Sequence, residues 1–213
     1  MAHPRVKICG ITNLADARRA CELGADFLGF NFYRESPRYI SPASAAKIAR
    51  HLPDTVATVG VFVNEGDDKV LEIAHAVGLD YVQLHGDETP QSVAQLARRV
   101  RVIKALRVKK SFRLAQLTRY KRANAFLLDG FDSRARGGTG KRFDWGIARR
   151  ATRGRRIFLA GGLTPANAAE ASRTVKPFAL DVCSGVEAKP GKKDAGLLKA
   201  FMRAAKNGKI DKP

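Results

Sequence analysis

The sequence predicts a (β/α)8 barrel, an α/β fold in which eight parallel strands alternate with helices. Three observations support this prediction: eight short apolar runs recur along the 213 residues, helix-capping residues separate them, and no linker divides the chain. Because barrels of this type commonly need about 200–250 residues, we expect one domain over residues 1–213. A doubly wound open sheet is the alternative, although nothing in the chain marks a switch point.

The expected strands are short and almost continuously apolar, as is typical of parallel strands that are covered on both faces. In chain order they are Arg5–Cys9, Phe27–Asn31, Val56–Val63, Tyr81–His85, Arg101–Leu106, Phe126–Asp129, Ile157–Ala160 and Ala179–Cys183.

The segments between these strands carry helix signals. Residues suited to an N-cap open most of them, at Asn13, Ser41, Thr89, Ser111, Asp144, Thr164 and Asp194. After three of these residues, at positions 42, 90 and 165, proline occupies the expected first helical position. Gly24 and Gly78 stand where a helix commonly ends in a left-handed residue.

The net charge of +19 is concentrated in one part of the chain. Residues 98–156 hold 20 Lys and Arg against 3 Asp and Glu, a charge of +17. Such a segment forms a solvated outer face, steers an anionic substrate or binds nucleic acid. Few aromatic residues interleave with the charges, which weakens the interpretation as a single-strand binder.

The cysteines and the N-terminus predict a cytoplasmic protein. Cys9, Cys21 and Cys183 are widely spaced and match no zinc pattern, so we expect free thiols in a reducing compartment. Residues 1–5 lack the apolar region of a signal peptide, and no apolar stretch has the length of a membrane helix.

Two ionisable residues end predicted strands, which in a barrel is where active sites lie. Cys9 ends the first strand and Asp129 ends the sixth. We expect burial at the end of an apolar strand to raise the pKa of Asp129, which suits a general acid. Each residue also has a structural interpretation, Cys9 as a small buried hydrophobe and Asp129 as a turn or cap residue.

Other polar and glycine-bearing segments follow the strands at the same end. His85 ends the fourth strand, and Arg38 lies on a loop where its guanidinium could bind a carboxylate or phosphate as a fork. Loops rich in backbone N–H donors contain Gly138, Gly140, Gly161, Gly162, Ser184 and Gly185. Such loops commonly bind phosphate in barrels, although each glycine alone is explained by turn geometry.

Several segments together make the chain similar to a known family. They are Lys7-Ile8-Cys9-Gly10-Ile11-Thr12, Ser36-Pro37-Arg38-Tyr39-Ile40, Val82-Gln83-Leu84-His85-Gly86, Leu127-Leu128-Asp129, Gly137-Gly138-Thr139-Gly140-Lys141, Ala160-Gly161-Gly162-Leu163 and the stretch from Asp181 to Gly191. The chain resembles phosphoribosylanthranilate isomerases of tryptophan biosynthesis, and the resemblance runs nearly from end to end.

This resemblance implies an Amadori rearrangement of N-(5-phosphoribosyl)anthranilate to the 1-deoxyribulose 5-phosphate product. It implies that the Cys9 thiolate is the general base and that Asp129 is the general acid. A thiolate at neutral pH needs a lowered pKa or a nearby cation, and Lys7 lies on the same strand face as Cys9. Acid and base suffice for the reaction, so no cofactor or metal is expected.

The resemblance also implies the substrate contacts. Arg38 would bind the anthranilate carboxylate, and the glycine loops would bind the phosphate. Further substrate-binding residues would be Lys7, His85 and Asp181. The expected partner is this anionic small molecule rather than nucleic acid or a membrane, with the chain a monomer or a homodimer.

Two departures and two alternatives remain at this point. Cys183 stands where the family would have a small residue, and residues 131–136 form a basic stretch of uncertain role. The alternatives are another aldose–ketose isomerase of phosphosugars, and a basic barrel that binds nucleic acid and has an inactive site. The presence of both Cys9 and Asp129 argues against the second.

Overall fold

Eight parallel strands close into a barrel, which confirms the predicted fold class. The computed structural model describes residues 3–109, 111–130 and 145–207. The strands are β1 (Arg5–Cys9), β2 (Phe27–Asn31), β3 (Ala57–Phe62), β4 (Tyr81–Leu84), β5 (Arg101–Arg107), β6 (Ala125–Asp129), β7 (Ile157–Ala160) and β8 (Ala179–Val182). Each strand pairs with the next, and β1 pairs with β8 to close the ring. The predicted strand ends differ from these by one residue at most.

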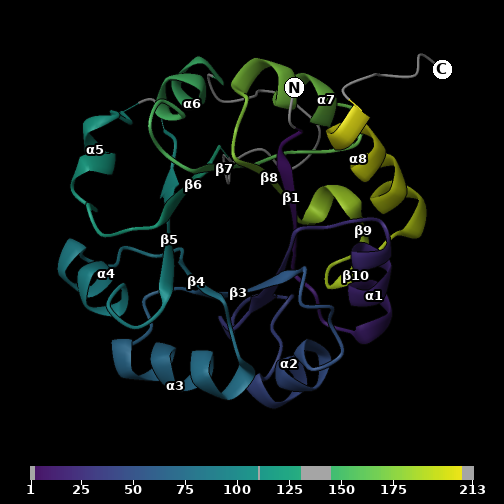
Figure 1. Cartoon of the computed structure of the whole chain (residues 1–213), viewed down its shortest axis with the longest axis horizontal. Helices are drawn as coiled ribbons and strands as arrows, with labels where there is room; N and C mark the ends of the chain where they lie inside the picture. The colour runs from purple at the N-terminus through teal and green to yellow at the C-terminus, as the bar shows by residue number, and fades with distance from the viewer. Residues whose placement is uncertain (1–2, 110, 131–144, 208–213) are drawn as a thin grey trace.

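Helices surround the ring of strands, as Figure 1 shows. They are α1 (Leu14–Glu22), α2 (Pro42–Ala49), α3 (Asp67–Val77), α4 (Pro90–Leu96), α5 (Ala115–Thr118), α6 (Trp145–Ala151), α7 (Ala168–Val175) and α8 (Ala195–Asn207). Among the described residues, no helix combines the length and the apolar character needed to cross a membrane.

Most of the predicted helix boundaries are confirmed by hydrogen bonds. The side chains of Asn13, Ser41 and Thr89 each accept a bond from the backbone N–H three residues later. Asp194 does the same for α8. Gly78 ends α3 in the left-handed conformation, with φ of 74°.

Two predicted helix starts are wrong, and a third lies outside the described residues. Thr164 does not begin α7, because the Asn167 side chain accepts from its backbone N–H and holds a turn that delays the helix to Ala168. Ser111 does not open a long helix. The Gln116 side chain accepts from the Arg113 backbone N–H just before α5, which has only four residues. The third expected N-cap, Asp144, is not among the described residues.

Two apolar layers stabilise the barrel. The inner layer fills the barrel with alternate residues of the strands: Phe27, Val59, Tyr81, Ile103, Ala105, Ala125, Leu127, Phe158, Ala160 and Ala179. The larger outer layer packs the other strand faces against the helices. Buried polar residues, among them Lys7, Gln83 and Asp181, follow the inner layer along the strands, so the barrel is apolar toward one end and polar toward the other.

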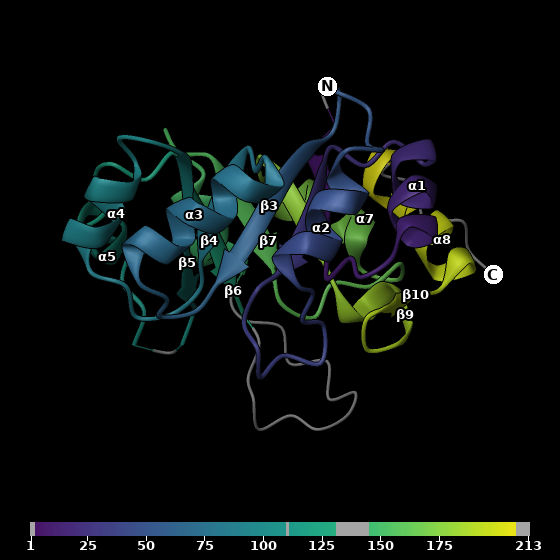
Figure 2. The same ribbon diagram turned by 90° about the horizontal axis from the view of Figure 1, so that it is seen from below.

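The carboxyl ends of the strands and the N-terminus lie at opposite ends of the barrel (Figure 2). After β8 the chain forms a short 3-10 helix, η1 (Ser184–Val186), and a hairpin of β9 (Glu187–Lys189) and β10 (Lys192–Lys193). The hairpin lies near the carboxyl end of β1 because the Lys193 backbone N–H donates to Asp16 at the start of α1.

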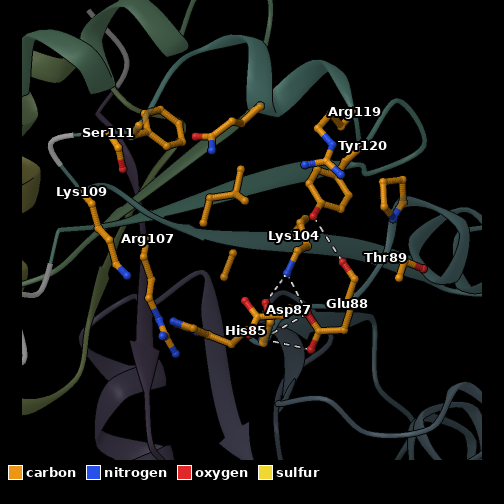
Figure 3. Close-up of a pocket in the computed structure, with 16 residues that line it drawn as sticks. His85, Asp87, Glu88, Thr89, Lys104, Arg107, Lys109, Ser111, Arg119 and Tyr120 are labelled. Carbon is orange, nitrogen blue, oxygen red and sulfur yellow. Dashed lines mark hydrogen bonds and ion pairs between the residues drawn. The ribbon is translucent and has the colours of Figure 1, made fainter.

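A buried ion pair fixes the loop that follows β4 (Figure 3). Lys104 of β5 is 1% exposed, and its Nζ lies 2.7 Å from Glu88 Oε2. Lys104 also donates to the carbonyl oxygens of Leu84 and Gly86, and Glu88 accepts from the backbone N–H groups of Asn64 and Gly86. Burial favours a raised pKa for Glu88, but the Lys104 ion pair and these backbone bonds outweigh it and lower the pKa.

We predict that Lys104→Met destabilises the protein by about 3 kcal/mol, because it leaves the Glu88 carboxylate buried without its partner. The matched control is Lys109→Met, which changes an exposed lysine shortly after the same strand. Urea denaturation at neutral pH measures both free energies of unfolding. Equal stability of the two variants would contradict a structural role for the ion pair.

Candidate active site

The Cys9 thiol lies at the carboxyl end of β1, beside a glycine of β2. Cys9 pairs in register with Gly29 of β2. A Cβ at Gly29 would lie 2.9 Å from Cys9 Sγ and 3.2 Å from Lys7 Nζ. The glycine therefore leaves room for both the thiol and the ammonium, and it brings them to one place.

Lys7 is held at this place by a buried ion pair between β1 and β8, the two strands whose pairing closes the barrel. Its Nζ lies 2.9 Å from Asp181 Oδ1, and Lys7 and Asp181 are register partners on β1 and β8. Burial opposes the charge of Lys7, but Asp181 and Cys9 outweigh burial and raise its pKa, so the ammonium stays charged. Burial raises the pKa of Asp181 to about 6, although Lys7 acts in the opposite direction.

The surroundings of Cys9 stabilise a thiolate. A hydrogen bond from the Cys183 thiol and the positive charges of Lys7 and Lys193 lower the pKa of Cys9 well below its usual value, against the opposing effect of burial. Lys193 comes from the hairpin and is buried, and its Nζ lies 3.9 Å from Cys183 Sγ. The fold thus supplies the cations that a basic thiolate needs.

Asp129 and His85 form a second polar pair at the same end of the barrel. Asp129 ends β6, which β7 and β8 separate from β1. His85 Nε2 lies 3.3 Å from Asp129 Oδ2, and the other ring nitrogen, Nδ1, lies 2.9 Å from Gln83 Nε2. Gln83 is 1% exposed and points into the barrel from β4. A buried amide therefore orients the imidazole, and the imidazole contacts the carboxyl group.

Arg38 is oriented by Glu187 in a two-pronged ion pair. Arg38 Nε lies 2.9 Å from Glu187 Oε1, and Nη2 lies 2.7 Å from Oε2. Glu187 also accepts from Lys193 Nζ at 2.9 Å. Burial acts to raise the pKa of Glu187, but these two cations outweigh it and lower the pKa. This carboxylate links Arg38 to the cation beside Cys183.

The glycine loops after β7 and β8 contact each other. Gly161 and Gly162 have φ of 88° and 65°, the left-handed region that favours glycine. A Cβ at Gly185 in η1 would overlap the carbonyl oxygen of Leu163. Ser184 opens η1 beside this contact. The remaining two glycines of the predicted phosphate loops, Gly138 and Gly140, lie outside the described residues.

A cavity of about 420 Å³ adjoins this end of the barrel, between the loops after β4 and β5 and helix α5 (Figure 3). His85 and Arg107 line it, together with Lys104, Lys109 and Arg119. Asp87 and Glu88 also line the cavity, and Glu88 pairs with Lys104, so the basic side chains outnumber the acidic ones. Among the described residues, no group of three His, Cys, Asp or Glu side chains is placed to hold a metal ion.

The structure brings the predicted residues together in two groups. Lys7, Cys9 and Asp181 form one group, and His85 and Asp129 form the other. Four contributing residues carried no predicted role: Gln83, Cys183, Glu187 and Lys193. Gln83 had a usable signal, because it shares a strand face with His85, whereas the hairpin that carries Lys193 has no periodic pattern.

Comparison with known proteins gives one consistent result. The family model for N-(5'-phosphoribosyl)anthranilate isomerase matches residues 6–204. The isomerase of Pelobacter propionicus is 54% identical over 202 residues, covering 95% of each chain.

Two solved structures are similar over nearly the whole chain. One contains monomers of the dimeric phosphoribosylanthranilate isomerase of Thermotoga maritima, with 44% identity, a TM-score of 0.84, and coverage of 95% of this chain and 98% of that one. The other is a phosphoribosylanthranilate isomerase in complex with reduced 1-(o-carboxyphenylamino)-1-deoxyribulose 5-phosphate, with 44% identity, a TM-score of 0.85 and the same coverage.

We predict that Lys193→Met raises the pKa of the Cys9 thiol, because it removes one of the cations beside the thiolate. The rate of Cys9 alkylation by iodoacetamide is measured at a series of pH values by peptide mass spectrometry. The pH at which this rate increases should be higher in Lys193→Met than in the wild type. Lys192→Met is the control, since Lys192 is the exposed neighbour in the same hairpin strand. An unchanged pH dependence in Lys193→Met would show that this cation does not act on Cys9.

Proposed function

The chain belongs to the N-(5'-phosphoribosyl)anthranilate isomerase family, and on that premise we propose that Cys9 is the general base and Asp129 the general acid of its reaction. The protein is an isomerase of tryptophan biosynthesis, and its reaction is an Amadori rearrangement of an aldose derivative to a ketose derivative. The assignment of the base is supported chiefly by the two cations near Cys9, Lys7 and Lys193, which stabilise its thiolate. The thiolate, rather than the thiol, is the form that can remove a proton from carbon.

In the proposed first step, Asp129 gives its proton to the furanose ring oxygen. The bond between that oxygen and C1′ breaks, and the electrons of the anilino nitrogen form the iminium. Contact with His85 supports this role. His85 Nε2 lies within reach of the carboxyl group, and the Gln83 amide holds the ring in this orientation through Nδ1.

In the second step, the Cys9 thiolate removes the proton from C2′. The electrons of the C–H bond form the double bond of an enolamine, and the iminium nitrogen becomes neutral. The enol then tautomerises to the ketone by moving its proton to C1′. Lys7 and Lys193 stabilise the thiolate before the transfer.

The remaining substrate contacts are proposed on charge and position. Arg38 donates from Nε and Nη2 to the Glu187 carboxylate. Its remaining nitrogen, Nη1, would bind the anthranilate carboxylate. Backbone N–H groups of the glycine loops would bind the phosphate: Gly138, Gly140, Gly161, Gly162, Ser184 and Gly185. Lys7, His85 and Asp181 would contact the ribose carbons and hydroxyls.

The proposal extends to the setting of the enzyme. One domain spanning residues 1–213 would act in the cytoplasm as a monomer or a homodimer, with the phosphorylated substrate as its partner and without nucleic acid. Its three free cysteines suit a reducing compartment. A solved relative described as monomers of a dimeric enzyme supports both states.

We predict that Cys9→Ser and Asp129→Asn each lower kcat by roughly a hundredfold to ten-thousandfold, because each removes one proton-transfer group. The assay generates phosphoribosylanthranilate in place and follows the loss of its fluorescence. Binding of reduced 1-(o-carboxyphenylamino)-1-deoxyribulose 5-phosphate, measured by calorimetry, should remain in both variants.

Matched controls are Cys21→Ser and Asp68→Asn, which change the same residue types on helices α1 and α3. Both should keep wild-type turnover. Substrate decay at the spontaneous rate with the wild-type protein would overturn the isomerase activity itself. Near-wild-type turnover in Cys9→Ser or Asp129→Asn would remove that residue from the mechanism.

The oligomeric state is tested separately by sedimentation equilibrium. We predict a mass of one or two chains across a wide concentration range. A larger assembly, or co-sedimentation with added nucleic acid at physiological salt, would contradict the proposed setting.

A further inference from the structure

Cys183, at a position where the resemblance led us to expect a small residue, lies beside Cys9. The register of β1 and β8 pairs Lys7 with Asp181 and Ile8 with Val182. Cys9 follows Ile8, and Cys183 follows Val182, so the same register places these two residues side by side. Adjacent strands lie about 4.8 Å apart, and in-register residues of parallel strands point to the same side. This spacing falls within the Cα separation of about 4.4–6.8 Å that disulfides adopt.

The two thiols interact at the carboxyl ends of β1 and β8. The Cys183 thiol hydrogen-bonds to Cys9. Gly10 follows Cys9 with φ of 75°, and a Cβ at Gly10 would lie 3.0 Å from Cys183 Sγ. A larger residue there would occupy the space that Cys183 fills. Both cysteines are partly exposed at the open end of the barrel.

The charges around the pair assign different roles to the two sulfurs. Lys7 and Lys193 favour the thiolate at Cys9. The pKa of Cys183 is raised, chiefly by its hydrogen bond to Cys9 together with burial and the charge of that thiolate, while Lys193 and Arg38 act to lower it. Cys9 is therefore the nucleophile in the resting protein. Once Cys9 no longer carries a negative charge, its charge no longer raises the pKa of Cys183, while Lys193 and Arg38 still act to lower it.

From this arrangement we infer that Cys9 and Cys183 form a peroxide-sensitive thiol pair that closes reversibly to a disulfide. Such a pair needs a low-pKa, accessible thiolate and a resolving cysteine next to it. The oxidant is a hydroperoxide, hydrogen peroxide being the simplest. The resulting disulfide is a modification site in addition to the catalytic role proposed for Cys9.

The chemistry proceeds in two balanced steps. The Cys9 thiolate attacks one peroxide oxygen, the O–O bond breaks, and the leaving oxygen takes a proton and departs as water or an alcohol. Cys9 is now a sulfenic acid, oxidised by two electrons. Cys183 loses its proton and attacks the Cys9 sulfur, and the expelled hydroxide takes that proton as water. A dithiol reverses the disulfide by exchange.

The disulfide would have two consequences. It removes the thiolate at Cys9, so turnover stops until the pair is reduced. It also protects Cys9 from further oxidation to the sulfinic acid, which is irreversible in most proteins. The loss of turnover rests on the catalytic role proposed for Cys9, whereas formation of the disulfide does not.

The test treats the purified, reduced protein with hydrogen peroxide in small excess and then blocks the remaining thiols with N-ethylmaleimide. In the wild type we expect a peptide that links Cys9 to Cys183, with Cys21 as the blocked thiol. Activity should fall by about tenfold or more, since no base remains, and a dithiol should restore it.

Two variants separate this disulfide from general oxidation. Cys183→Ser keeps a hydrogen-bond donor beside Cys9 but cannot form the bond. After peroxide treatment, this variant should lose activity relative to its own reduced form, and a dithiol should not restore that activity. Cys21→Ser should behave as the wild type.

Two outcomes would overturn the inference: the absence of the linked peptide in oxidised wild type, and equal recovery of wild type and Cys183→Ser after reduction. A linked peptide in a fully active protein would instead support the modification site and contradict the role of Cys9 as base.

Discussion

The ion pair of Lys7 and Asp181 is the interaction on which the rest of the site depends. It joins β1 to β8, the two strands that close the barrel, and both side chains are buried. A buried ammonium without its carboxylate would be strongly unfavourable, so Asp181 makes the charge of Lys7 sustainable inside the protein. That charge in turn lowers the pKa of Cys9. The contact between Lys7 and Asp181 therefore both helps to close the barrel and helps to lower the pKa of the Cys9 thiol.

The two sides of the barrel mouth differ in their electrostatics. On the β1 and β8 side, Lys7 and Lys193 surround a thiol and favour its anionic form. On the β4 and β6 side, the His85 imidazole contacts Asp129, and the Gln83 amide contacts the other nitrogen of that imidazole. An acid and a base that act in one turnover need environments that push their proton affinities apart. Cys9 and Asp129, proposed for these roles, lie on strands that two others separate.

The fold, and the placement of Cys9 and Asp129 at strand ends, could be predicted from the sequence because their signals are local. Strand ends, caps and the positions of Cys9 and Asp129 follow from short runs of residues. The partners of those residues could not be predicted in this way. Lys193 reaches the site from a hairpin with no periodic pattern, and Cys183 is brought beside Cys9 by the pairing of the first and last strands. The predicted helix start at Ser111 was wrong, because the Gln116 side chain accepts from the Arg113 backbone N–H just before α5.

The claim that the fold stabilises a thiolate at Cys9 is tested most directly by titrating that thiolate. In a Cys21→Ser background, the ultraviolet absorbance of the thiolate is followed against pH, with Cys9 identified by its loss in Cys9→Ser. The account predicts a midpoint well below the value of about 8.5 for an ordinary cysteine, and a higher midpoint in Lys7→Met. A midpoint at or above the ordinary value in the native protein would contradict it.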